Sequence, residues 1–244
     1  GFNAGSARAA NEIAANAFMV THVSAAAATL SWVIAEWKIH GKPTVLGAVS
    51  GGVAGLVSIT PAAGFVTALS AVAIGLLAGI ICFLSVSMIK IRFGYDDALD
   101  AFGVHGVGGA WGALATGLFA SKAVNEAGAD GLLYGNPAQF ASQFVGVAVN
   151  CLFAVLMTVL IMKSLALFMK IRVEESQENW GLDITEHGER GYIQQDLATG
   201  APVIHPTPAA NPLSIPETSP ASPLDLLYPP SPRPPPPTRP PQCR

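Results

Sequence analysis

Long stretches without a charged side chain dominate the first 172 residues of the chain. The longest of these stretches are residues 13–35, 43–89, 101–121 and 131–162. A helix that crosses the roughly 30 Å apolar core of a bilayer needs about 20 apolar residues. Because each stretch is at least that long, the pattern predicts membrane-spanning helices rather than the half-apolar helices of a soluble protein.

The stretch at 43–89 is too long for one crossing, and a proline divides it. Pro61 disfavours helical backbone in the preceding residue, Thr60. Five spans are therefore predicted, at residues 9–37, 43–60, 64–90, 98–121 and 137–170. The fold class that follows is an all-α polytopic membrane protein.

Basic residues collect in the connections on one side of these spans. Short cytoplasmic loops are rich in Lys and Arg, and this bias sets the orientation of a membrane protein. The connections on the side expected to be cytoplasmic carry six basic residues: Lys38, Lys42, Lys90, Arg92, Lys170 and Arg172. The opposite side has only Arg8 and Lys122. We therefore expect a plasma (inner) membrane protein with a cytoplasmic C-terminus and with Gly1 on the outer side.

The composition changes abruptly after the last span. Residues 1–172 form the expected transmembrane domain, and residues 173–192 form a charged segment that we expect in the cytoplasm. Residues 201–244 contain 16 of the 19 prolines. We expect the tail at 193–244 to be disordered, although its polyproline run at 229–237 also has the composition of a ligand for an SH3-like module.

The charge content excludes several classes of function. Charged residues make up 12% of the chain, whereas soluble domains average about 25%. A net charge of −3 provides no basic surface for nucleic acid. The sequence contains no hydrolytic or phosphate-binding motif, and its three cysteines do not have the spacing of metal ligands. We therefore expect no enzyme activity, no metal and no cofactor.

His105 is the strongest candidate for a functional residue within a span. Placing an ionisable side chain inside a membrane costs free energy, so a residue of this kind is expected to have a function. Helical spacing predicts one face that carries Asp97, Ala101, His105, Gly108 and Gly112, where small residues could leave a narrow path beside the imidazole. The alternative is a structural histidine that is hydrogen-bonded to a neighbouring carbonyl.

Three aspartates precede His105 at the expected cytoplasmic start of the fourth span. Carboxylates there complement the positive end of the helix dipole, which accounts for Asp96 and Asp97. Asp100 lies nearly one turn deeper and is less easily explained as a cap.

Several segments together resemble the ammonium transporter family of Amt, Mep and Rhesus proteins, and most closely its Amt branch. They are residues 1–7 (GFNAGSA), 41–43 (GKP), 59–62 (ITPA), 100–109 (DAFGVHGVGG), 116–120 (TGLFA), 181–183 (GLD) and 187–189 (HGE), with Tyr192. The resemblance covers roughly residues 1–192. It implies the fold of this family, in which two inverted repeats form eleven spans around a pore. The five spans predicted here are similar to the last five.

The resemblance also implies roles for individual residues. His105 would be the second of the two pore histidines, Phe2 part of an aromatic gate, and Ser6 an acceptor for the ammonium ion. Ala101 and Phe102 would lie near the pathway, and Thr60 would lie in its wall. Asp97 and Asp100 would support the cytoplasmic end of the fourth span.

The function implied is transport: ammonium is recruited at an outer vestibule, deprotonated, and conducted as ammonia through a histidine-lined apolar pore. The implied assembly is a homotrimer, with a PII-type signal protein as a possible partner of residues 173–192. The chain starts without Met, so we expect a fragment that lacks the first pore histidine and its supporting Asp. Two alternatives stay open, an ammonium sensor that signals through the C-terminal region and a non-conducting fragment.

Overall fold

The computed structural model describes residues 1–189, which form helices and no β-strand. The chain divides into two units, Gly1–Arg172 and Val173–Arg244, and each is described by itself. The all-α fold expected from the charge-free stretches is confirmed for the described residues.

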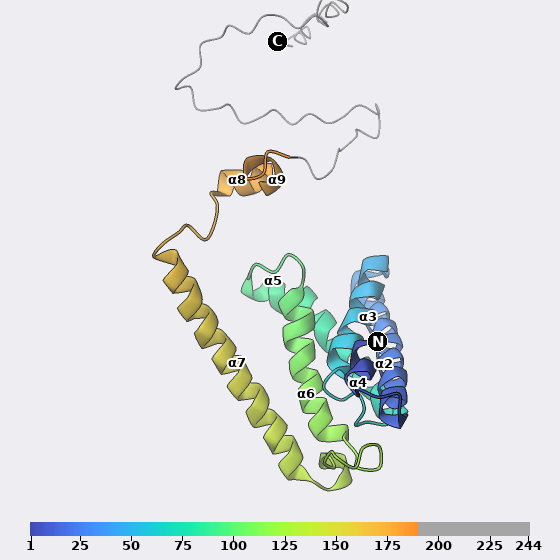
Figure 1. The fold of residues 1–244 in the computed structure, drawn as a ribbon. Helices are drawn as coiled ribbons and strands as arrows, with labels where there is room; N and C mark the ends of the chain where they lie inside the picture. Colours follow the sequence, from blue (N-terminus) through green and yellow to red (C-terminus); the bar gives the residue numbers. More distant parts are fainter. Residues whose placement is uncertain (190–244) are drawn as a thin grey trace, which may run out of the picture. The chain divides into compact units, whose positions relative to one another are not determined.

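Three helices form the centre of the first unit, α2 (Glu12–His40), α3 (Val45–Ile59) and α4 (Ala68–Leu84). They lie side by side, as Figure 1 shows. Helix α3 ends at Ile59, immediately before the Thr60-Pro61 step, where the sequence predicts a break. Apolar side chains from all three helices and from α6 (Val107–Phe119) form the buried core between them.

Glycines allow the three helices to approach closely around Ser24 of α2. A Cβ atom on Gly75 of α4 would lie 2.9 Å from Ser24 Cα, and one on Gly55 of α3 would lie 2.7 Å from Ala25 Cα. The Ser24 hydroxyl donates a hydrogen bond to the Gly55 carbonyl, with an oxygen–oxygen distance of 3.0 Å. Small residues and interhelical hydrogen bonds are the usual means of association where lipid removes the hydrophobic drive between helices.

A buried carboxylate joins α2 to α3, and the sequence analysis did not single it out. Glu36 is 8% exposed. Its carboxylate accepts hydrogen bonds from the Thr44 backbone N–H (3.1 Å) and from the Thr44 hydroxyl (2.9 Å). The Thr44 Oγ1 in turn accepts from the Gly47 N–H at 2.9 Å and so caps α3. Glu36 therefore acts as an anchor for the start of α3, because Thr44 is the N-cap of that helix.

Helix α4 continues without a break through the π-helical segment η1 (Ser85–Ile89) into α5 (Lys90–Phe93). After a loop, a second π-helical segment, η2 (Phe102–Gly106), leads directly into α6. Helix α6 is bonded to the central helices through the Ser58 hydroxyl, which donates to the Gly108 carbonyl at 3.0 Å.

Helix α7 (Pro137–Ala166) has 30 residues, and none of them is buried in the described structure. It contacts α6 near its own N-terminal end, where a Cβ atom on Gly117 would lie 3.0 Å from Phe140 Cα. From there α7 diverges from α6, as Figure 1 shows. Most of this apolar helix is consequently uncovered by the rest of the first unit.

In the part of the chain that the structure describes, three helical segments are long and apolar enough to cross a membrane: Glu12–His40, Ala68–Phe93 and Pro137–Ala166. The predicted spans at 43–60 and 98–121 correspond to the shorter α3 and to η2 with α6. The crossings themselves, and the division at 172 and 192, remain predictions.

The described part of the second unit contains two short helices, α8 (Glu175–Trp180) and α9 (Leu182–Thr185). A capping box between Glu174 and Gln177 begins α8. The tail predicted at 193–244, and Tyr192, lie outside the described residues.

The close approach of α3 and α6 predicts a sharp difference between two glycines of one helix. In Gly112→Ala the new Cβ would lie 3.0 Å from Ser58 Cα, whereas in Gly109→Ala the nearest atom would be Val57 Cγ1 at 4.0 Å. We expect Gly112→Ala to destabilise the protein by about 1–3 kcal/mol, because backbone atoms must separate. Thermal unfolding in detergent measures this, and equal transition temperatures for the two variants would contradict it.

Candidate functional site

One group of predicted residues lies around the short helix α1 (Phe2–Gly5). The Asn3 side-chain amide donates to Thr21 Oγ1 at 3.0 Å and, at 3.5 Å, to Thr60 Oγ1. The Ser6 hydroxyl donates to the Phe2 carbonyl at 3.1 Å. Through Asn3, the structure thus brings Thr60 next to the α1 segment that carries Phe2 and Ser6, although Thr60 is far from that segment in the sequence.

Phe2, Asn3, Ser6 and Thr60 are called the outer group below, after the side of the membrane on which the sequence predicts them. Two hydroxyl groups of the outer group already donate their protons to backbone carbonyls. Thr60 Oγ1 donates its proton to the Leu56 carbonyl at 2.7 Å and uses a lone pair to accept the hydrogen bond from Asn3. Ser6 Oγ likewise donates to Phe2, which leaves its lone pairs available to a donor. A hydroxyl in this state is suited to accept a hydrogen bond from a cationic N–H group.

Asn3 connects this group, and the sequence analysis passed over it. Its position between Phe2 and Ser6 in the run GFNAGSA was the available signal. Its partners Thr21 and Thr60 could not be found from spacing, because they depend on how α1 packs on two other helices.

A second group consists of Phe102 and His105 in the wide, π-helical turn η2 and of Ala101, which directly precedes it. The Asp97 carboxylate accepts hydrogen bonds from three successive backbone N–H groups, those of Ala101 (2.8 Å), Phe102 (3.0 Å) and Gly103 (3.4 Å). These are N–H groups that a helix start leaves without partners. Asp97 therefore caps the segment that carries His105.

Asp100 and Asp96 differ from Asp97 in their contacts. Asp100 adopts a left-handed backbone with φ of +54°, and its carboxylate contacts the Lys90 ammonium group at 2.7 Å. Asp96 is exposed and makes no capping hydrogen bond within the described residues.

The single face predicted for Asp97, Ala101, His105, Gly108 and Gly112 is wrong. Asp97 precedes the helix, Ala101 and His105 are exposed, and Gly108 and Gly112 are buried against α3. The cause is the π-helical turn, which contains one more residue than an α-helical turn and so shifts the register of everything before it.

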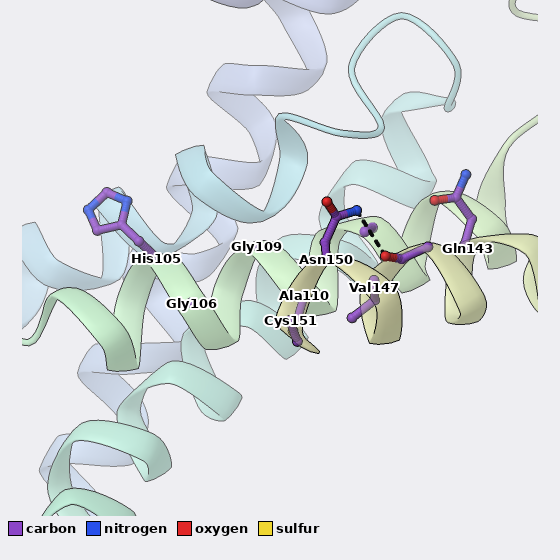
Figure 2. A pocket seen from close by; sticks show the side chains of 10 residues that line it. His105, Gly106, Gly109, Ala110, Gln143, Val147, Asn150 and Cys151 are labelled. Atoms are coloured by element: carbon purple, nitrogen blue, oxygen red, sulfur yellow. Dashed lines mark hydrogen bonds between the residues drawn. The ribbon is translucent and has the colours of Figure 1, made fainter. Parts of the chain in front are cut away.

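His105 lies at one end of a groove of about 320 Å³ between α6 and α7, as Figure 2 shows. Gly106, Gly109 and Ala110 form the α6 side of the groove, whereas Gln143 and Asn150 contribute amides from α7. The Asn150 amide donates to the Gly146 carbonyl of its own helix at 2.9 Å. The sequence analysis did not identify either amide.

The histidines of the first and fourth predicted spans, His22 and His105, have different surroundings. A ring nitrogen of His22 lies 2.8 Å from the Phe18 carbonyl of its own helix. The His105 ring has no hydrogen bond to any described residue. No described carbonyl therefore acts as the partner that a structural histidine at this position would need. Among the described residues, no group of three or more His, Cys, Asp and Glu side chains could hold a metal ion.

All six predicted pathway residues are exposed in this structure. The set consists of Phe2, Ser6, Thr60, Ala101, Phe102 and His105. Phe2 is 83% exposed and Phe102 is 58% exposed. Aromatic faces of this kind attract cations, and a histidine can donate or accept a proton near neutral pH. The outer group and the His105 group thus offer two chemically distinct surfaces on the first unit.

Comparison with known proteins supports a family assignment. The sequence model of the Ammonium Transporter Family matches residues 1–192. An ammonium transporter of Bacillus subtilis (strain 168) is 52% identical over 192 residues, which are 79% of this chain and 48% of the relative. The chain therefore spans about half the length of the curated relatives that it matches.

Solved structures give the same result for the fold. The crystal structure of Saccharomyces cerevisiae Mep2 superposes with a TM-score of 0.70 at 35% identity, covering 75% of this chain and 42% of that chain. A structure described as a sensor Amt protein superposes with a TM-score of 0.64 at 28% identity, covering 76% of this chain and 45% of that chain. Together with the apolar helices α2, α4 to α5, and α7, these matches show that the chain is an integral membrane protein and belongs to the ammonium transporter family.

Proposed function

We propose that the protein transports ammonium across the membrane by recruiting the cation at an outer site, removing its proton, and conducting ammonia past His105. The observation that carries the proposal is the His105 imidazole, which stands exposed on a capped wide turn and has no hydrogen bond to any described residue. The family match over residues 1–192 supports ammonium as the substrate.

The cost of burying a charge is the physical reason for deprotonation. An unpaired cation in an apolar environment costs many kcal/mol, and burial favours the neutral form of such a group. Ammonium and potassium are close in size, so a pore that selected by radius alone would discriminate poorly. A pathway that strips a proton admits ammonium, whereas potassium has no proton to lose.

The outer group supplies the recruitment step in this proposal. The Phe2 ring would attract the cation, an interaction worth about 0.5–2 kcal/mol depending on desolvation. Ser6 Oγ would accept a hydrogen bond from ammonium, which is supported by the engagement of its own proton with the Phe2 carbonyl. Thr60 would form the adjoining wall through its link to Asn3.

The His105 group supplies the conduction step. Phe102 lies in the same turn as His105, Ala101 directly precedes that turn, and both would line the pathway beside His105. The imidazole would contact ammonia by a hydrogen bond and either relay the released proton or tune the electrostatics of the pore. Asp97 and Asp100 would support the turn, which their contacts with its backbone and with Lys90 favour.

The proposal extends to location and assembly. In this proposal the protein is a transporter without enzyme activity. It lies in the plasma (inner) membrane, with Gly1 outside and residues 173–192 in the cytoplasm. The proposal includes a homotrimer and a PII-type signal protein as partner of residues 173–192, both supported by resemblance to the family. A complete pathway would also need residues from a first half, including a second histidine and its supporting Asp.

A sensor is the second candidate function, because one structural relative is described as a sensor Amt protein. The same outer group would bind ammonium in a sensor, but the cation would not cross. Uptake of labelled methylammonium by vesicles that contain the full-length protein separates the two. Binding without uptake would favour the sensor and would overturn transport.

The central role of His105 predicts a large loss of flux in His105→Ala. We expect ammonium flux into proteoliposomes to fall by about tenfold or more, which corresponds to about 1.4 kcal/mol on the barrier. His22→Ala is the matched control, since the His22 ring is already bonded within its own helix. Equal flux and selectivity in the wild type and in His105→Ala would remove His105 from the pathway.

The outer group predicts a different signature for Ser6→Ala. Loss of one hydrogen bond, worth roughly 0.5–1.5 kcal/mol, should raise the half-saturating ammonium concentration about 2- to 10-fold and leave the maximal rate nearly unchanged. Ser164→Ala is a suitable control, because the Ser164 hydroxyl bonds only to the Leu160 carbonyl of its own helix. An unchanged concentration dependence in Ser6→Ala would count against recruitment at this site.

A further inference from the structure

A lysine from another helix, α5, holds the wide turn that carries His105. No sequence pattern singled out this lysine for the role. Lys90 is the first residue of α5 and directly follows η1. Its Nζ donates to the Asp97 carbonyl oxygen at 2.5 Å and to Asp100 Oδ1 at 2.7 Å. One ammonium group therefore fixes both ends of the four-residue stretch that precedes η2.

The two aspartates bonded to Lys90 are the ones that determine how η2 begins. Asp97 caps η2 through its carboxylate, while its backbone carbonyl accepts from Lys90. Asp100 has a φ of +54°, a left-handed conformation that is uncommon for residues other than glycine and that Asp adopts more readily than most. The ion pair with Lys90 is a contact that can impose it.

The other side of η2 packs against the helix that leads to Lys90. A Cβ atom on Gly103 would lie 2.7 Å from Val86 Cγ2 of η1, and Cys82 Sγ lies 3.9 Å from the Val104 carbonyl oxygen. The Ser85 hydroxyl is buried beside Gly103 and has no hydrogen-bond partner among residues 1–189. The two π-helical segments are thus in direct contact. Lys90 follows η1 directly, and its hydrogen bonds to Asp97 and Asp100 add a further link between the two segments.

The consequence for His105 follows from helix geometry. A π-helical turn bonds residue i to i+5, one residue more than an α-helical turn. An α-helix rotates by about 100° per residue. If η2 relaxed to an α-helical turn, Ala101 and Phe102 would rotate by about 100° relative to His105.

We propose that Lys90 is a positioning residue for His105: through Asp97 and Asp100 it holds the wide turn that turns the imidazole toward the ammonium pathway. The inference rests on the proposed function for the identity of the substrate. The link between Lys90 and the geometry of η2 can be measured independently of that substrate.

The test compares Lys90→Met, Lys90→Arg and the control Arg92→Met in the full-length protein. Arg92 is an exposed cation two residues beyond Lys90, so its loss changes the local charge equally. Hydrogen exchange reports the Ala101, Phe102 and Gly103 amides that Asp97 caps. Ammonium flux into proteoliposomes is the functional readout.

We expect Lys90→Met to accelerate exchange in the segment 101–106 by about tenfold or more, while peptides of α2 stay unchanged. The Lys90 ammonium group holds the residues from which Asp97 caps these amides, so its loss lets the capped turn open more often and exposes the amides to exchange. Ammonium flux should fall by a similar factor. Lys90→Arg should restore both readouts to within about twofold, because a guanidinium can donate to both oxygens, and Arg92→Met should match the wild type.

Two results would overturn the role of Lys90 where the wild type transports ammonium. One is unchanged exchange and flux in Lys90→Met, and the other is equal damage in Lys90→Arg and Lys90→Met. A wild type that carries no ammonium would instead overturn the proposed function, whereas the exchange pattern and its restoration by Arg would still decide whether Lys90 holds the turn.

Discussion

The arrangement of the His105 segment depends on the capping of its first turn by the Asp97 carboxylate. Three backbone N–H groups point to one carboxylate, at 2.8, 3.0 and 3.4 Å. The start of a helix leaves its first backbone N–H groups without a partner inside the helix, and the Asp97 carboxylate accepts from three of them. The same carboxylate stands at the positive end of the helix dipole, so that one side chain satisfies both demands. This cap allows a wide turn to exist where an ordinary helix would place different residues beside His105.

Close packing of small residues fixes the rest of α6 in relation to that turn. Gly112 and Gly108 lie against α3, and the Ser58 hydroxyl bonds across to Gly108. These contacts bury one side of α6 and leave His105, Gly106 and Gly109 on the other side, facing the groove beside α7. The side used for packing and the side proposed for ammonium are therefore separate. A substitution on the packed side should alter stability, whereas one on the groove side should alter flux.

Sequence alone was sufficient for the features that depend on local composition. Charge-free stretches predicted helices at the right places, and Pro61 predicted the end of α3, because both effects act within a few residues. His105 was predicted as a site residue because it is an ionisable group within a predicted span, whereas Phe2, Ser6 and Thr60 were predicted only from the resemblance. The face shared by His105 was mispredicted, since a π-helical turn has no sequence signature and depends on Asp97, on Lys90 and on packing against Val86. Asn3 and Glu36 were missed for a related reason: their partners, Thr21, Thr60 and Thr44, become neighbours only when the helices pack.

The most direct test of the account is a density map of the full-length protein in lipid nanodiscs with methylammonium present. The account predicts one continuous path that begins between Phe2 and Ser6, passes Thr60, and reaches His105 on an intact wide turn. Density for the ligand should lie within hydrogen-bond distance of Ser6 Oγ. A map in which packed apolar side chains enclose the His105 ring, with no opening toward Ser6, would contradict the account.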